Sequence, residues 1–247
     1  IDMVVKDIIP GRGPITGGSS ILLIGEEYTD NPNIRCKFGT MSVRARWLSP
    51  SEVECISPRQ PSSGLVNVTL GIGDEFSESS GVQFEYYNDT IIVDFEPKVG
   101  PVVGGIQVKV IVDTALYETD DLVCRFGIVA VPGTHLNANV VQCSPPPNRA
   151  GAAVSLSISR NGGHDYSLHS KQSFAYFSSP TIDAVSPFFG RRGRRTKVKV
   201  EGSGFQPDGL SSTSTRCVFG ENSTVVPPSF IARDEIHCDA PISSTTD

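Results

Sequence analysis

The chain has 247 residues, a net charge of −6, and 24 glycines, 18 prolines and 6 cysteines. An acidic chain with scattered lysines is a poor candidate for nucleic-acid binding, because duplex affinity requires many phosphates to be neutralised at once. No run of about 18 apolar residues occurs, so a membrane attachment would need a span outside this chain. The start has neither Met nor a basic-then-apolar leader, and we expect a fragment of a longer protein.

Three stretches of the chain open in the same way, with an apolar strand that runs into a proline and a glycine-rich turn. The first stretch covers residues 8–18 and leads into an alternating strand at residues 20–25. The second, residues 95–105, aligns with it without a gap, whereas the third, residues 185–190, keeps only the proline and one glycine. Proline cannot donate a backbone hydrogen bond and therefore limits pairing at an edge strand, and glycine adopts the positive φ that a tight corner requires. The pattern predicts a β module copied three times.

Two cysteines follow in each copy, the first in Cys-x-Phe-Gly and the second just ahead of a proline. The pairs are Cys36 and Cys55, Cys124 and Cys143, and Cys217 and Cys238. One pair per repeat predicts a disulfide inside each module and hence an oxidising compartment, with reduced buried cysteines as the alternative. A zinc site is disfavoured because the chain has no Cys-x-x-Cys motif and its histidines do not recur with the repeat.

Three acceptor triplets for N-glycosylation also point to a secreted protein; they begin at Asn67, Asn88 and Asn222. In the strand at residues 65–70, alternation directs Val66, Val68 and Leu70 to the core and turns Asn67 to solvent. A glycan on Asn67 would therefore not disturb the fold. Asn88 lies in the short junction between the first two modules.

We predict modules at residues 1–87, 88–178 and 179–247, with the third incomplete because the chain ends before its last two strands. Each complete module closes on a strand with two aromatic residues on one face, at residues 84–86 and 174–176. We interpret these rings as core, with a surface binding stripe as the alternative, and Trp47 as a residue of the core or of an interface. About five residues connect each module to the next. Connections this short predict a rigid array.

Several of these motifs together resemble the IPT/TIG family. They are the Pro-x-x-Gly opening, Cys-x-Phe-Gly, and Val-x-Cys-x-x-Pro at residues 53–58, compared with residues 141–146. The family comprises immunoglobulin-like modules found in plexins, transcription factors and other receptors. The resemblance covers essentially the whole chain and implies an all-β fold of three tandem immunoglobulin-like β-sandwiches. It implies no catalytic residues, and we expect no cofactor, no metal and no enzymatic activity.

Other polar clusters have simpler interpretations. Asn161-Gly162-Gly163 is typical of a turn between strands, and we interpret the segment up to Asp165 in that way. Glu118, Asp120 and Asp121 lack the ligand spacing of a calcium site, so we expect a solvated acidic face. Sequence motifs for hydrolases, phosphate loops and dinucleotide sites are absent.

The third copy replaces the glycine corner with a basic run that continues into its next strand. Alternation in residues 196–200 turns Lys197 and Lys199 outward, so we expect six cations to share one edge; they are Arg191, Arg192, Arg194, Arg195, Lys197 and Lys199. Three interpretations remain open for this run. It could be a soluble surface turn, a contact for an acidic glycan or acidic protein, or a processing site, since Arg192-Gly193-Arg194-Arg195 fits a basic cleavage pattern.

The leading functional hypothesis is a non-enzymatic part of an extracellular or cell-surface glycoprotein, serving adhesion, receptor recognition or spacing. Its partners would be proteins or adjacent modules, with an acidic glycan as a further candidate. The alternatives are a structural component of a surface or ciliary filament, accessory modules of a secreted carbohydrate-active enzyme, and an intracellular transcription factor. The cysteine pairs and acceptor triplets argue against the last of these.

Overall fold

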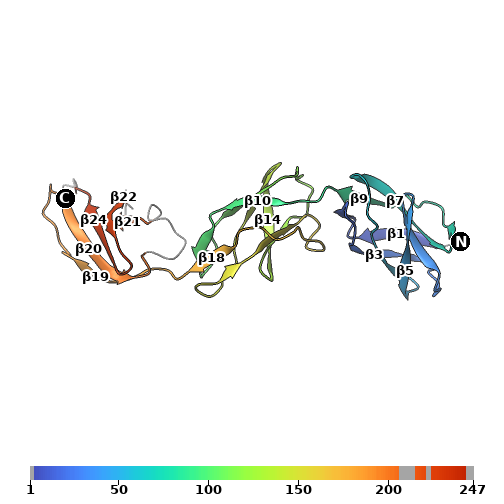
Figure 1. Cartoon of the computed structure of the whole chain (residues 1–247), viewed down its shortest axis with the longest axis horizontal. Helices are drawn as coiled ribbons and strands as arrows, with labels where there is room; N and C mark the ends of the chain where they lie inside the picture. The colour runs from blue at the N-terminus through green and yellow to red at the C-terminus, as the bar shows by residue number, and fades with distance from the viewer. Residues whose placement is uncertain (1–2, 206–214, 221–223, 243–247) are drawn as a thin grey trace. The chain divides into compact units, whose positions relative to one another are not determined.

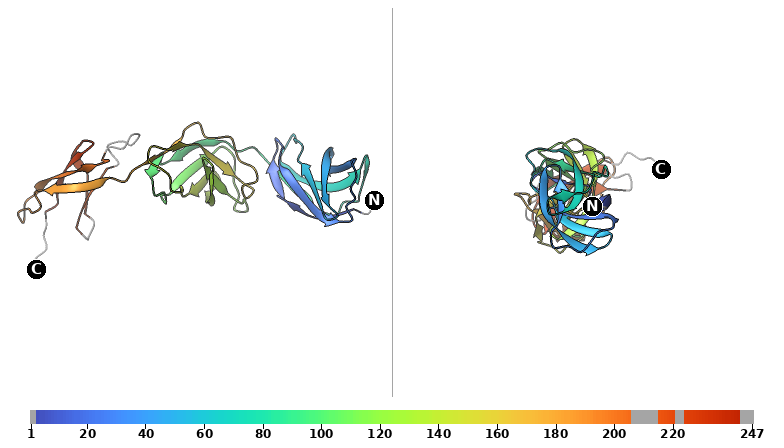
Figure 2. Two further views of the ribbon diagram at one scale, coloured as in Figure 1. Left: turned by 90° about the horizontal axis from the view of Figure 1, so that it is seen from below. Right: turned by 90° about the vertical axis from the view of Figure 1, so that its right-hand side faces the viewer.

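The computed structural model describes residues 3–205, 215–220 and 224–242. All regular elements of the described residues are β-strands, so none of these residues forms a helix that could cross a bilayer (Figures 1 and 2). The all-β prediction is confirmed. Two compact units are present: unit 1 comprises Ile1–Pro97, Gln107–Pro145 and Ser155–Ser173, and unit 2 comprises Lys98–Ile106, Pro146–Val154 and Phe174–Asp247.

In unit 1, the first repeat forms one sheet in the order β1-β3-β6-β5-β4-β7-β9-β2, with β8 beside β7. Its strands are β1 (Val4–Ile9), β2 (Arg12–Pro14), β3 (Ser20–Glu26), β4 (Ile34–Phe38), β5 (Met41–Ser49), β6 (Glu52–Ile56), β7 (Gly64–Ile72), β8 (Glu75–Phe76) and β9 (Gln83–Tyr87). The glycine corner is explained at Gly13, where a Cβ atom would lie 2.5 Å from Ser19 Oγ and 2.8 Å from the Phe84 ring. Strand β2 can pair in parallel with β9 there because Gly13 has no side chain.

Alternation along the strands builds the core of the first repeat. Ile21 and Leu23 of β3 are fully buried, and the rings of Phe38 and Phe84 meet edge to face with centroids 5.6 Å apart. Trp47 packs against this cluster, and its Nε1 atom donates a hydrogen bond of 3.1 Å to the Tyr28 carbonyl. The interpretation of Trp47 as core packing agrees with the structure.

The remaining sheet of unit 1 belongs to the second repeat and has the order β10-β12-β15-β14-β13-β17. Its strands are β10 (Ile92–Glu96), β12 (Val108–Val112), β13 (Val123–Phe126), β14 (Val129–Asn137), β15 (Val140–Cys143) and β17 (Leu156–Ser159). Unlike the other strands, β17 is buried at every position, and the segment that follows it carries several of the polar residues described below.

Unit 2 holds three smaller sheets. The first has the order β11-β18-β16 and is formed by β11 (Val99–Pro101), β16 (Ala153–Val154) and β18 (Phe174–Phe177). The third repeat supplies the other two sheets. Its strands are β19 (Thr181–Ser186), β20 (Thr196–Ser203), β21 (Cys217–Phe219), β22 (Thr224–Val226), β23 (Pro228–Ile231) and β24 (Glu235–Ala240). The sheet orders are β19-β20-β24-β23 and β21-β22. Its small core contains Val198, Val200, Phe205 and Ile236.

A disulfide lies at the same place in every repeat. It joins Cys36 to Cys55, Cys124 to Cys143, and Cys217 to Cys238, with Cα atoms 6.4, 6.3 and 6.4 Å apart. In the first repeat, β5 pairs with β4 through its first half and with β6 through its second half, and the disulfide connects those two partners. Strand β14 changes partner in the same way in the second repeat. In the third, the corresponding strand is divided into β22 and β23, and Pro227 lies between them.

Candidate functional site at the junction of the first two repeats

A buried charge cluster connects the first repeat to the second within unit 1. Arg12, on the short strand β2, places its guanidinium against the Asp120 carboxylate, and its Nη2 atom lies 2.8 Å from Glu85 Oε2. Asp120 lies 108 positions further along the chain. The Arg12 side chain is only 13% exposed, so this ion pair is largely shielded from solvent.

Asp120 is the centre of this cluster. Its side chain is fully buried, and Oδ2 accepts hydrogen bonds of 2.9 Å from Arg160 Nε and 3.0 Å from the Tyr117 backbone N–H. A buried carboxylate is costly unless its oxygens are fully used by donors. Two guanidinium groups and one backbone N–H meet that requirement here, and the two arginines come from different repeats.

The ring of Tyr87 at the end of β9 lies under both guanidinium groups. The guanidinium Cζ atoms of Arg160 and Arg12 lie 4.7 and 5.8 Å from the centroid of the Tyr87 ring, within the range of cation–π attraction. Burial, with the nearby Asp165 carboxylate, raises the pKa of Tyr87. The phenol therefore stays neutral and contributes a ring face without adding a charge.

A second polar contact uses the turn at residues 161–165. Asn161 donates from Nδ2 to the Arg12 carbonyl at 3.0 Å and to Asp165 Oδ2 at 2.7 Å, and the same carboxylate oxygen accepts a 2.7 Å hydrogen bond from Ser19 Oγ. Gly162 and Gly163 have φ values of +71° and +91°, which side chains rarely adopt. These two glycines allow the chain to turn back so that both polar side chains reach the first repeat.

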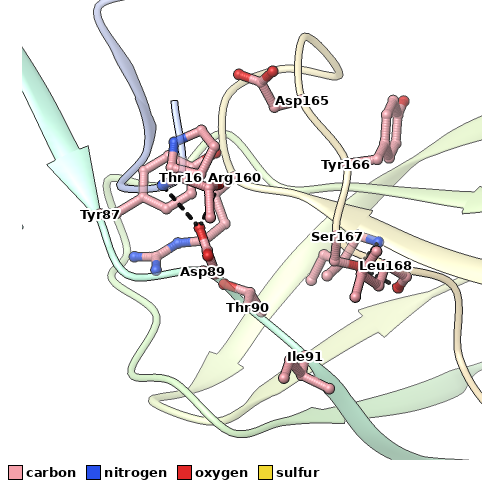
Figure 3. Close-up of a pocket in the computed structure, with 12 residues that line it drawn as sticks. Thr16, Tyr87, Asp89, Thr90, Ile91, Arg160, Asp165, Tyr166, Ser167 and Leu168 are labelled. Atoms are coloured by element: carbon pink, nitrogen blue, oxygen red, sulfur yellow. Dashed lines mark hydrogen bonds between the residues drawn. The ribbon is translucent and has the colours of Figure 1, made fainter. Parts of the chain in front are cut away.

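A cavity of about 310 Å³ lies beside these contacts (Figure 3). Thr16 Oγ1 donates a 3.0 Å hydrogen bond to Asp89 at its edge, and Arg160 and Tyr87 lie against the same space. On the other side of the cavity, Figure 3 shows Tyr166, Ser167 and Leu168 along one segment. Its lining combines apolar side chains such as Ile91, Ile158 and Leu168 with the charged residues Asp89, Arg160 and Asp165.

The structure corrects the interpretation of the acidic run. Asp120 was expected on a solvated face, but it is buried because Arg12 and Arg160 surround it, whereas Glu118 is exposed. The turn at residues 161–165 is present, but its contacts to the first repeat were not predicted. One signal was available: Arg12 stands where the aligned second copy has Val99, so a charge replaces an apolar residue at an equivalent position.

The predicted glycosylation sites have different surroundings. Asn67 on β7 is exposed, with Val68 and Leu70 fully buried on either side of the partly buried Thr69, so the expected register is present. Asn88 is exposed in the connection between the first two repeats, and Thr90 of its triplet is buried against Thr114. Asn222 lies outside the described residues.

The four arginines of the basic run lie in the connection between β19 and β20, and Lys197 and Lys199 lie on β20 itself. Arg191, Arg192, Arg194, Arg195 and Lys197 are exposed. Lys199 does not fit the proposed polyanion edge, because its Nζ atom lies 2.7 Å from Glu201 and 2.9 Å from Glu235. The hydrogen bond from Lys199 lowers the pKa of Glu235. Two exposed rings precede the arginines, with Phe188 and Phe189 at 87% and 74% exposure.

The part of the chain that the structure describes contains no group of three His, Cys, Asp or Glu side chains placed to hold an ion. The arrangement at the junction can instead hold two modules together. Its polar contacts connect residues of the first repeat to residues of the second within unit 1.

Comparisons with known proteins agree with the fold. The IPT/TIG domain family matches residues 3–86, 91–176 and 180–247. Mouse Plexin-A4 is 23% identical over 203 residues, which is 75% of this chain and 10% of that protein. A probable serine/threonine-protein kinase drkC of Dictyostelium discoideum is 29% identical over 85 residues, which is 32% of this chain and 11% of that protein. The chain therefore spans about a tenth of the length of these relatives.

Among solved structures, the plexin A4 extracellular region, domains 1 to 10, matches with a TM-score of 0.53 and 18% identity, over 98% of this chain and 21% of that one. This likeness supports the immunoglobulin-like fold that the sequence predicted. The family match covers nearly every residue in three successive copies. The chain belongs to the IPT/TIG domain family, as an array of three repeats.

Proposed function

We propose that this chain is a non-enzymatic segment of a receptor-type extracellular glycoprotein, in which the first two repeats hold recognition surfaces at a fixed spacing. The observation that carries the proposal is the buried junction of Arg12, Asp120 and Arg160. If the two modules moved independently, Arg12 would separate from Asp120, and the buried carboxylate would lose one of its charged partners. We also propose repeat boundaries at residues 87/88 and 178/179.

The extracellular location is supported by the disulfide in each repeat and by the similarity to a plexin ectodomain. Other members of the family are intracellular transcription factors, but disulfides are rare in the reducing environment of the cytosol and nucleus. A surface filament and a secreted carbohydrate-active enzyme remain weaker alternatives, because no described feature favours head-to-tail assembly or saccharide chemistry at the junction. Adhesion and recognition of a protein partner are the functions we infer for the array.

The experiment that tests the proposal measures the distance between the first two repeats. Spin labels carried by unnatural amino acids at the exposed positions Thr40 and Lys109 leave the disulfides intact. Double electron–electron resonance on the full chain should give one narrow distance distribution. The variant Arg12→Ala, which removes the cationic partner contributed by the first repeat, should broaden it. A broad distribution in the unmodified chain would show that the modules move independently and would refute the spacing role.

We predict that Asn67 carries an N-linked glycan when the chain is secreted from eukaryotic cells. Its side chain is exposed on β7, so a sugar can be accommodated without a change in the core. Peptide mass spectrometry after enzymatic deglycosylation should show conversion of Asn67 to Asp. Thr69→Val, which removes the acceptor motif but keeps a β-branched residue, should abolish that conversion. A secreted chain with unmodified Asn67 would contradict the prediction.

We further propose that the exposed arginines of the third repeat contact an acidic glycan or an acidic protein surface. Replacement of Arg191, Arg192, Arg194 and Arg195 by serine should markedly reduce retention on a heparin column, and salt should weaken retention of the unmodified chain. Replacement of all four by lysine keeps the charge and should preserve most of the retention. Equal retention of the serine variant and the unmodified chain would exclude this contact.

A further inference from the structure

The connection between β19 and β20 combines a specific sequence with an open geometry. Arg192-Gly193-Arg194-Arg195 is followed directly by Thr196, the first residue of β20. All four residues are exposed, and the turn that contains them is closed by a 3.3 Å hydrogen bond from the Arg194 N–H to the Arg191 carbonyl, with Gly193 at a φ of +74°. A glycine-containing turn of this kind can be extended readily, and proteases bind their substrates as extended chains.

The strand pairing leaves room for such an extension. The register between β19 and β20 begins only at Ser186 opposite Lys199, so Thr196, Lys197 and Val198 are paired on one side alone, with β24. Opening of Thr196 and Lys197 would expose the bond after Arg195 without separating β19 from β20 and without moving Val198, which is buried in the core of the repeat. Exposed connections with few protecting hydrogen bonds are the preferred sites of cleavage in folded proteins.

We propose that the Arg195–Thr196 peptide bond is a processing site for a subtilisin-like endoprotease of the secretory pathway, selective for arginine at the first, second and fourth positions before the cut. Arg195, Arg194 and Arg192 occupy these positions, and their cationic groups suit a substrate groove lined by carboxylates. Water supplies the atoms: the amide C–N bond breaks, Arg195 gains a carboxylate, and Thr196 gains an amino group. Processing in cells rests on the proposed extracellular route, whereas the cleavage itself can be tested on purified protein.

The disulfides determine what such a cut would produce. Cys36, Cys55, Cys124 and Cys143 precede the cut, and Cys217 is joined to Cys238 after it, so no disulfide connects residues 1–195 to residues 196–247. The two pieces would remain associated through the pairing of β19 with β20, from Thr181 opposite Ser203 to Ser186 opposite Lys199. The cut chain would be a noncovalent two-piece repeat.

The test uses the full chain secreted from cells that lack the processing protease, followed by incubation with a purified paired-basic-specific subtilisin-like endoprotease. We expect one cut, with intact masses that match residues 1–195 and 196–247, and two bands on a denaturing gel without reductant. Under native conditions the pieces should elute together from a sizing column. Failure to cut the folded chain, while a synthetic peptide of residues 188–199 is cut, would overturn the proposal.

Two variants separate this proposal from charge binding by the same arginines. Arg195→Lys keeps the charge but removes the arginine at the cut bond, and it should slow cleavage by at least tenfold while retention on heparin is unchanged. Arg191→Ser lies one position outside the motif and should be cut at the unmodified rate. Equal cleavage of Arg195→Lys and the unmodified chain would indicate a nonspecific basic protease site and would overturn the assignment. Circular dichroism checks that both variants are folded.

Discussion

Replacement of Asp120 by alanine is expected to destabilise the second repeat by about 3–5 kcal/mol, because Arg160 would then be buried without its carboxylate partner. The Arg160 side chain is only 3% exposed, so water cannot readily take the place of Asp120. Arg12 is affected less, since it keeps Glu85 as a second partner. The loss should be largest in the strands of the second repeat that adjoin Arg160.

Hydrogen exchange measures this effect locally, which suits an array that does not unfold in one step. Amides of β17 should lose protection in the Asp120→Ala variant, and the exchange rates in β3 should change little. Glu118→Ala is the matched control, because that residue is an exposed carboxylate two positions away and should have no effect. If both variants exchanged at the same rate, the buried cluster would have no energetic role.

Removal of the first disulfide by the double replacement Cys36→Ala and Cys55→Ala is expected to cost the first repeat about 3 kcal/mol. The bridge closes a loop with a sequence separation of 19, which restricts the unfolded chain, and its loss restores that freedom. Both sulfur atoms lie in the core, so a small cavity adds to the loss.

This change should stay within the first repeat. Protection of the β4 and β6 amides should fall, while amides of β13 and β15, which carry their own disulfide, should keep theirs. The corresponding replacement of Cys124 and Cys143 provides the reciprocal comparison. A loss of protection that spread equally across both repeats would show that they unfold as one unit, and it would require a stronger junction than the polar contacts described above.

The fold was predictable because its determinants are local. The alternation in β3 and β7, the glycine corner and the Cys-x-Phe-Gly motif each act over a few residues, and threefold repetition makes each pattern easier to recognise. The junction was not predictable in the same way. Arg12 and Asp120 are 108 positions apart, and nothing in the sequence near Asp120 indicates that an arginine from another repeat will cover it.

The sequence also could not show how the cations of the third repeat are divided. Lys197 and Lys199 have the same spacing and the same outward direction. The Lys199 Nζ atom, however, forms ion pairs with Glu201 and with Glu235 of β24, whereas Lys197 is exposed and only its backbone register places it opposite Asp239. Charge partners of this kind depend on strand register, and register depends on pairing between distant segments. The four arginines precede β20, so the register of that strand does not determine their neighbours.

The strand that changes partner within each repeat has a consequence for a protein under tension. Strand β5 and its counterparts lie inside the loop that the disulfide closes, so a pulling force on the two ends of a repeat passes through the sulfur bridge and bypasses that loop. At about 3.4 Å for each extended residue, the bridge withholds roughly 60 Å of contour length from every unfolded repeat. An array built in this way would lengthen in short steps when stretched, one for each repeat that unfolds. Reduction of the disulfides would make each step longer.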